Sequence, residues 1–173
     1  MTQATPSSRD LMIFYMAARN AASLPGAGLG LSHVEAEAVK QLEQEIDQRH
    51  DTWYTQSQLY ISNPSLTVLT SKISHFVHLR FLNLHDCRLS ALPPETGNLT
   101  LLKEIWLGNN PLPPDNVESI FYQLPALETV HLMGTDQALI TMVRQKFPRL
   151  CLKITSGEEE VIDLRPKSFC WLV

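Results

Sequence analysis

Leucine recurs along the middle of the chain at intervals that match neither an α-helix nor a β-strand. In the stretch LRFLNLHDCRL (79–89) it occupies positions 79, 82, 84 and 89, and Cys87 stands between the last two. The stretch LKEIWLGNNPL (102–112) has the same frame, with Asn110 at the place of Cys87. Apolar residues alternate along a half-buried strand and recur about every three or four residues along a helix. The frame therefore indicates a repeated unit rather than a single helix or strand.

Weaker copies of the frame flank these two. The stretch LETVHLMGTDQ (127–137) keeps its first three apolar positions, and QSQLYISNPSL (56–66) keeps its last three. The stretch FPRLCLKI (147–154) opens in the same way and predicts a last strand over 150–154. The segments that join the frames, 66–79 and 89–102, are equal in length and share leucine at their first, fourth and last positions.

The repeated frame resembles the leucine-rich repeat (LRR) family over roughly residues 56–154. The joining segment LSALPPETGNLTLL (89–102) is similar to the intracellular type with L-P-x-x-x-x-x-L convex segments, although Thr96 stands at the usual isoleucine site. The resemblance implies an α/β fold, a solenoid shaped as a short horseshoe of about four to five repeats, with a parallel concave sheet and an N-terminal helical cap. The expected divisions are a helical cap at 1–50, the repeats at 51–155 and a C-terminal cap or tail at 156–173.

Two segments before the repeats are candidates for the cap. Residues 32–50 predict a helix, because Ser32 and Glu35 form a capping box. Its expected apolar stripe consists of Val34, Ala38, Leu42 and Ile46. The run LMIFYMAA (11–18) is far shorter than the roughly 20 residues of a membrane span, so we expect a second helix that packs on the core.

The repeat frame assigns a role to Cys87 and Asn110. Both follow a predicted strand and turn inward, where Asn110 can bond the backbone of neighbouring turns and Cys87 is its apolar substitute. Prolines at 93, 94, 113 and 114 bar regular helix at the start of the joining segments, and a short helix can begin at Asp115.

Composition limits the classes of partner. Fourteen Lys and Arg against eighteen Asp and Glu give a formal charge of -4, so the chain lacks a general attraction for nucleic acid. Three scattered cysteines favour a reducing compartment, which makes the cytoplasm the expected location. We find no motif for a catalytic site, a metal site or a cofactor, and the GAGLG stretch (26–30) lacks the spacing of a phosphate loop. The chain is therefore expected not to be an enzyme.

The residues that face outward from the predicted strands form the candidate binding surface. Exposed Trp, Tyr and Met on a concave face are residue types that carry protein-binding energy. The expected function is a non-catalytic adaptor, scaffold or regulatory subunit that binds a protein or peptide there. An open alternative is that the N-terminal segment covers this face. The candidate partner-binding residues are Tyr60, Phe81, Asn83, His85, Glu104, Trp106, His131 and Met133.

The end of the chain, SFCWLV, suggests an alternative function. Cys170 is the fourth residue from the end and resembles a C-a-a-X prenylation box, from which Trp171 and Val173 depart. Prenylation would make the protein a membrane-associated signalling or effector LRR protein, and the membrane is expected as a partner only in that case. The other interpretation of the tail is that Phe169 and Trp171 pack on the end of the repeats. A structural subunit of a larger assembly is a further alternative.

Overall fold

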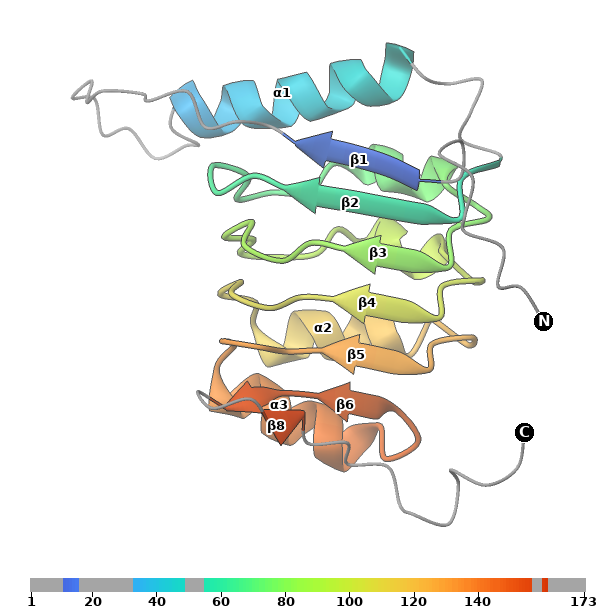
Figure 1. Cartoon of the computed structure of the whole chain (residues 1–173), viewed down its shortest axis with the longest axis vertical. Helices are drawn as coiled ribbons and strands as arrows, with labels where there is room; N and C mark the ends of the chain where they lie inside the picture. Colours follow the sequence, from blue (N-terminus) through green and yellow to red (C-terminus); the bar gives the residue numbers. More distant parts are fainter. Residues whose placement is uncertain (1–10, 16–32, 49–54, 157–159, 162–173) are drawn as a thin grey trace.

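The computed structural model describes residues 11–15, 33–48, 55–156 and 160–161. Within them, six parallel strands form one sheet in the order β1-β2-β3-β4-β5-β6. The segments that join the strands lie behind this sheet, and the helix over 33–48 lies at its β1 end (Figure 1). Five of the strands come from the predicted repeats: β2 Gln58–Ser62, β3 Phe81–Asn83, β4 Glu104–Trp106, β5 Thr129–His131 and β6 Cys151–Lys153. The α/β solenoid expected from the sequence is confirmed.

The strands are aligned so that equivalent residues of the repeats are neighbours. Leu82 of β3 pairs with Leu59 on one side and Ile105 on the other, and the same register continues through Val130 to Leu152. These central strand residues are buried at 0–2% exposure. Burial of one face of every strand fixes this register, because a slip by one residue would bring polar side chains into the core.

The second side of the core is formed by the segments that join the strands. They contain short 3-10 helices, η2 Ser71–His75 and η3 Pro94–Asn98, and two α-helices, α2 Pro114–Phe121 and α3 Gln137–Lys146. Pro93 and Pro113 precede η3 and α2 in extended conformation. Helix α2 begins at Pro114, one residue before the predicted start, because the first helical position needs no backbone N–H donor.

Helix α1, His33–Gln48, confirms the helix predicted before the repeats and packs on the N-terminal end of the core. Ala38, Leu42 and Ile46 are buried there. Two polar contacts fix the helix to the first joining segment: Thr70 Oγ1 donates to Glu43 Oε1 over 2.7 Å, and Lys72 Nζ lies 2.6 Å from Asp47 Oδ2. The predicted stripe was wrong at Val34, which is 39% exposed, because it lies in the first turn beyond the edge of the core.

The prediction of a helix over 11–18 was wrong. Residues Leu11–Tyr15 form strand β1, which pairs with β2 from Leu11 beside Gln58 to Tyr15 beside Ser62 (Figure 1). A short apolar run has no periodicity that separates a buried helix from a strand. Without β1, β2 would be an edge strand with unpaired amide and carbonyl groups. A strand at 11–15 satisfies these groups, which favours the strand over a helix. This part of the N-terminal segment extends the sheet rather than crossing its face.

Strands β7, Thr155–Ser156, and β8, Glu160–Val161, form an antiparallel pair after the last repeat. The tail with Phe169, Cys170 and Trp171 lies outside the described residues, so the prenylation and tail-packing interpretations stay predictions. No helix in the described part of the chain combines the length and apolar character needed to cross a membrane.

Asn110 bonds neighbouring turns of the solenoid, as predicted. Its amide Nδ2 donates to the carbonyl oxygens of Leu84 (2.7 Å), Leu107 (3.0 Å) and Gly108 (3.0 Å), and its Oδ1 accepts from the Leu89 N–H at 2.8 Å. The side chain is 3% exposed. It therefore satisfies backbone groups at the bends after β3 and β4 that would otherwise be buried without partners.

Cys87 occupies the same position one repeat earlier. Its Sγ lies 3.2 Å from the carbonyl oxygen of Ile61 and 3.7 Å from that of His85. The thiol is fully buried, and burial is the main cause that raises its pKa to about 11. A thiol that stays protonated at neutral pH is a poor nucleophile, so the predicted structural role is confirmed.

Candidate binding surface

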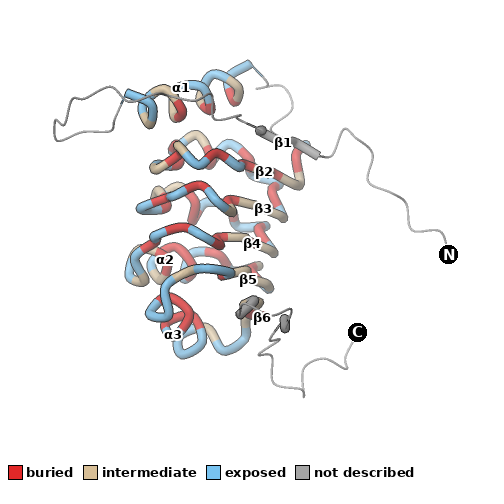
Figure 2. The backbone as a smooth tube through the Cα atoms, turned by 60° about the vertical axis from the view of Figure 1, so that its left-hand side comes forward, coloured by how far each residue is buried: buried red, intermediate tan, exposed pale blue. Residues whose placement is uncertain are grey.

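The side chains between the buried strand residues form two aligned rows on the open face of the sheet, the face opposite the helices. Buried and half-buried residues alternate along β3, β4 and β5, as Figure 2 shows. The first row consists of Gln58, Phe81, Glu104 and Thr129, and the second of Tyr60, Asn83, Trp106, His131 and Lys153. We call these two rows the open-face strip.

Aromatic rings in the open-face strip form a continuous series across four strands. The ring centroids of Tyr60 and Phe81 are 4.8 Å apart, and those of Phe81 and Trp106 are 6.0 Å apart. Trp106 stacks on His131 with 4.0 Å between centroids and 21° between the ring planes. These contacts leave the rings half-buried and restrict their movement, so the series is a preorganised apolar surface.

Glu104 lies among these rings and holds two of them. Its Oε1 accepts a hydrogen bond from Trp106 Nε1 at 2.7 Å and lies 2.8 Å from His131 Nε2. The residue precedes Trp106 by two positions on β4, while His131 comes from β5. One carboxylate oxygen therefore fixes the relative position of two rings from different strands.

The pKa of His131 lies below its ordinary value of 6.5. Burial is the main cause, since it disfavours the charged imidazolium, and the positive charge of Lys153 acts in the same direction. Glu104 opposes this shift by its negative charge and its hydrogen bond. The balance leaves His131 neutral at pH 7, so its Nε2 donates to Glu104 as an uncharged N–H.

Tyr60 also titrates away from its ordinary value. Burial raises the pKa of its hydroxyl, and the negative charge of Glu104 raises it further. Tyr60 is therefore a neutral phenol at physiological pH, and its Oη donates to Gln58 Oε1 at 3.5 Å.

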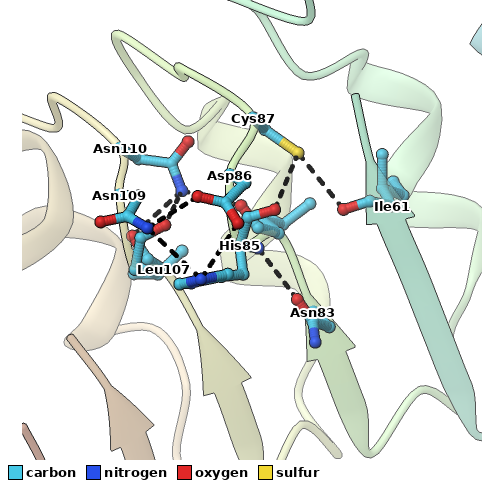
Figure 3. A network of polar contacts seen from close by, with 10 residues as sticks. Ile61, Asn83, His85, Asp86, Cys87, Leu107, Asn109 and Asn110 are labelled. Carbon is cyan, nitrogen blue, oxygen red and sulfur yellow. Dashed lines mark hydrogen bonds and ion pairs between the residues drawn. The ribbon is translucent and has the colours of Figure 1, made fainter. Parts of the chain in front are cut away.

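A polar network follows the strands at one rim of the sheet (Figure 3). His85 Nε2 lies 3.2 Å from Asp86 Oδ2, and Asn109 Nδ2 donates to Asp86 Oδ1 at 2.7 Å. Asn83 Oδ1 accepts from the His85 backbone N–H at 2.9 Å. Asp86 and Asn109 have left-handed backbone conformations, with φ of 60° and 55°, which short polar side chains tolerate best.

The next residues along this rim are Gly108 and Met133. A Cβ atom at Gly108 would meet His85 Nδ1 and would lie 2.6 Å from the Met133 carbonyl oxygen, so glycine allows the close approach of β-turns in adjacent repeats. The Met133 side chain is 39% exposed at the edge of the open face. The rim thus joins a rigid polar network to an accessible apolar side chain.

Repeats of one frame stack strand on strand, and a buried Asn110 bonds the turns. The fold is an α/β solenoid whose repeats carry the leucine frame. No family model matches the sequence, and no curated protein matches it. Solved structures similar to the chain include an LRR protein of Leptospira interrogans, at 27% identity and a TM-score of 0.46 over 58% of this chain and 25% of that one. Another is the Toll–Spätzle complex of Drosophila, at 18% identity and a TM-score of 0.37 over 50% of this chain and 15% of that one. The chain spans a quarter or less of the length of the chains it matches.

The structure brings most of the predicted surface residues into contact with one another. Tyr60, Phe81, Glu104, Trp106 and His131 form one connected group through their rings and hydrogen bonds. Asn83, His85 and Met133 lie beside this group toward the rim. The eight residues therefore share one face of the solenoid, and their role in binding stays a prediction.

Lys153, Asp86 and Asn109 are among the polar residues of this surface that the sequence analysis did not name. Lys153 is the register neighbour of His131, while Asp86 and Asn109 complete the rim network. The repeat frame contained the signal for all three. Lys153 is the outward residue after Leu152 in the last strand, and Asp86 and Asn109 occupy equivalent positions after β3 and β4. Across the part of the chain that the structure describes, no group of three or more His, Cys, Asp or Glu side chains could hold a metal ion.

Proposed function

We propose that this chain is a non-catalytic interaction module that binds a protein or peptide on the open-face strip, as an adaptor, scaffold or regulatory subunit of the intracellular LRR type. The observation that carries the proposal is the ring series from Tyr60 to His131. Aromatic residues at the centre of an interface typically contribute about 2 kcal/mol or more each. A preorganised series loses little side-chain entropy when a partner binds.

The shape of the surface favours an extended partner. The strip crosses β2, β3, β4 and β5 along the long axis of the sheet (Figure 1). The ring series from Tyr60 to His131 follows the same direction. Polar side chains lie at the Asn83–Asn109 rim. Apolar rings flanked by polar groups are the usual arrangement of a protein interface.

Selection from a random-peptide library displayed on phage tests the proposal. The wild-type protein is the bait, and enriched peptides are measured against Trp106→Ala and Tyr60→Ala. We expect the affinity to fall about tenfold or more in both variants, because each removes a ring of the series. Tyr122→Ala is the matched control, since Tyr122 is a 64% exposed aromatic residue at the end of α2, behind the sheet.

Two results would contradict the proposal. One is enrichment of peptides that bind wild type and the strip variants equally well. The other is an equal loss of affinity in Tyr122→Ala. Circular dichroism and urea unfolding of each variant establish that a loss of binding does not come from a loss of folding.

A further inference from the structure

The carboxylate of Glu104 stands at the centre of the open-face strip with half of its hydrogen-bonding capacity unused. Its two partners among the described residues, Trp106 Nε1 and His131 Nε2, both contact Oε1. No described residue bonds Oε2, and the side chain is 33% exposed. Glu104 can therefore accept a further donor from a molecule that lies on the strip.

Within the described residues, no lysine or arginine forms an ion pair with Glu104. Its neighbour in the sequence, Lys103, is held by Glu128, with 2.7 Å between Nζ and Oε1. Lys153 lies on β6, two strands from β4, beside His131. Because burial lowers the pKa of His131, its imidazole is neutral at pH 7 and does not balance the charge of Glu104.

We propose that the open-face strip recognises a cationic side chain of its partner, a lysine or an arginine, that forms an ion pair with Glu104 and packs its aliphatic stem against Phe81 and Trp106. This inference rests on the proposed function and names the chemistry of the partner. Phe81 is the register neighbour of Glu104, and Trp106 donates to its carboxylate, so apolar surface and negative charge adjoin. Lysine and arginine side chains combine an apolar stem with a charged end in the same way.

Other partner side chains fit this position less well. An apolar residue would cover Oε2 without giving it a hydrogen bond, and a buried carboxylate oxygen without a donor is costly. An aspartate or glutamate would add like-charge repulsion at short range. A partner cation instead compensates the charge at a position where the carboxylate is already fixed by the indole and imidazole N–H groups.

The test uses peptides enriched on the wild-type protein from the random-peptide library. Each is synthesised in its selected form and with its lysine or arginine replaced by glutamine, and both forms are measured by fluorescence anisotropy. We expect a basic residue at one common place in the enriched peptides. Glu104→Gln should weaken binding of the basic peptide about tenfold and change binding of the glutamine peptide much less. The glutamine peptide already lacks the cation, so removing the carboxylate charge breaks no ion pair in its complex.

Glu95→Gln is the matched control. It removes the same charge from a half-buried residue of η3, behind the sheet, so a general effect of net charge would weaken binding equally in both variants. Equal effects of Glu104→Gln and Glu95→Gln would overturn the inference. So would peptides that depend on Trp106 but bind Glu104→Gln as well as wild type; that outcome leaves the proposed function intact. Peptides that depend on neither residue would overturn both proposals.

Discussion

Trp106 stacks on His131 with 4.0 Å between the ring centroids, and both rings bond the same oxygen of Glu104. The two aromatic residues lie on adjacent strands, so the contact depends on the register of β4 and β5. Titration of His131 is therefore sensitive to the geometry of the open-face strip and can be used to examine it in solution.

We expect His131 to titrate below 6.5 in the folded protein, because burial disfavours its charged form. Glu104→Gln should lower this pKa further, since the carboxylate favours the imidazolium. Histidine C–H chemical shifts followed by NMR against pH measure both values, and the missing signal in His131→Gln assigns the resonance. A pKa that rises in Glu104→Gln would contradict the described contact.

The same shift predicts a dependence of stability on pH. A folded-state pKa below the unfolded value means that the unfolded chain takes up the proton first as the pH falls. The contribution of His131 is therefore fully present above pH 6.5 and is lost as the pH falls through the folded pKa. Urea unfolding at about pH 7.5 and about pH 5 should show a larger loss for wild type than for His131→Gln. Equal losses in the two proteins would exclude this contribution.

Replacement of Asn110 should strongly destabilise the solenoid. Asn110→Ala leaves the Leu89 N–H and the Leu84 carbonyl buried without their side-chain partner. We expect a loss of about 3 kcal/mol in the free energy of unfolding by urea, since each orphaned group costs about 1 to 3 kcal/mol. Asn98→Ala, at an exposed position, is the control and should change stability by less than about 0.5 kcal/mol. Similar losses in both variants would show that the hydrogen bonds of Asn110 do not contribute the expected free energy of unfolding.

Thr96→Val should stabilise the protein. Thr96 is fully buried in the middle of η3, and its Oγ1 has no hydrogen-bond partner among the described residues. Valine keeps the shape and removes the buried hydroxyl, so the melting temperature should rise with a gain of about 1 kcal/mol. Thr100→Val, at an exposed position, should give no such gain. A loss of stability in Thr96→Val would indicate that the hydroxyl is satisfied in solution.

Cys87 should resist alkylation in the folded protein. Its side chain is fully buried and its pKa is raised to about 11, so neither access nor thiolate is available at about pH 8. Iodoacetamide treatment followed by peptide mass spectrometry should find Cys87 unmodified in native buffer and modified in urea. Rapid labelling of Cys87 in native buffer would contradict its structural role.

The repeat frame explains why much of the fold could be predicted. Leucines at fixed places imply equivalent strands, and equivalent strands imply a register, so the inward Leu82 and outward Trp106 followed from counting along the chain. Helix α1 was predictable for a local reason, because its buried stripe of Ala38, Leu42 and Ile46 lies within the helix itself. The eight candidate surface residues came from the same frame.

Side-chain contacts between repeats could not be predicted from the spacing of residues along the chain. The position of one Glu104 oxygen between Trp106 and His131 depends on rotamers and on the distance between strands, and neither is encoded by spacing. The lowered pKa of His131 follows from burial by its neighbours, which exists only in the assembled sheet.

The sequence by itself determined the repeat, the inward and outward positions, and the inward place of Asn110 after its strand, because each depends on the spacing of residues along the chain. Only the tertiary structure decided that Leu11–Tyr15 is a strand, since the same apolar run can satisfy its backbone in a helix or at a sheet edge. The available edge of β2 selects the strand. The tertiary structure also decided that Glu104 lies among aromatic rings with its Oε2 unbonded, because that arrangement requires β3, β4 and β5 to be in contact.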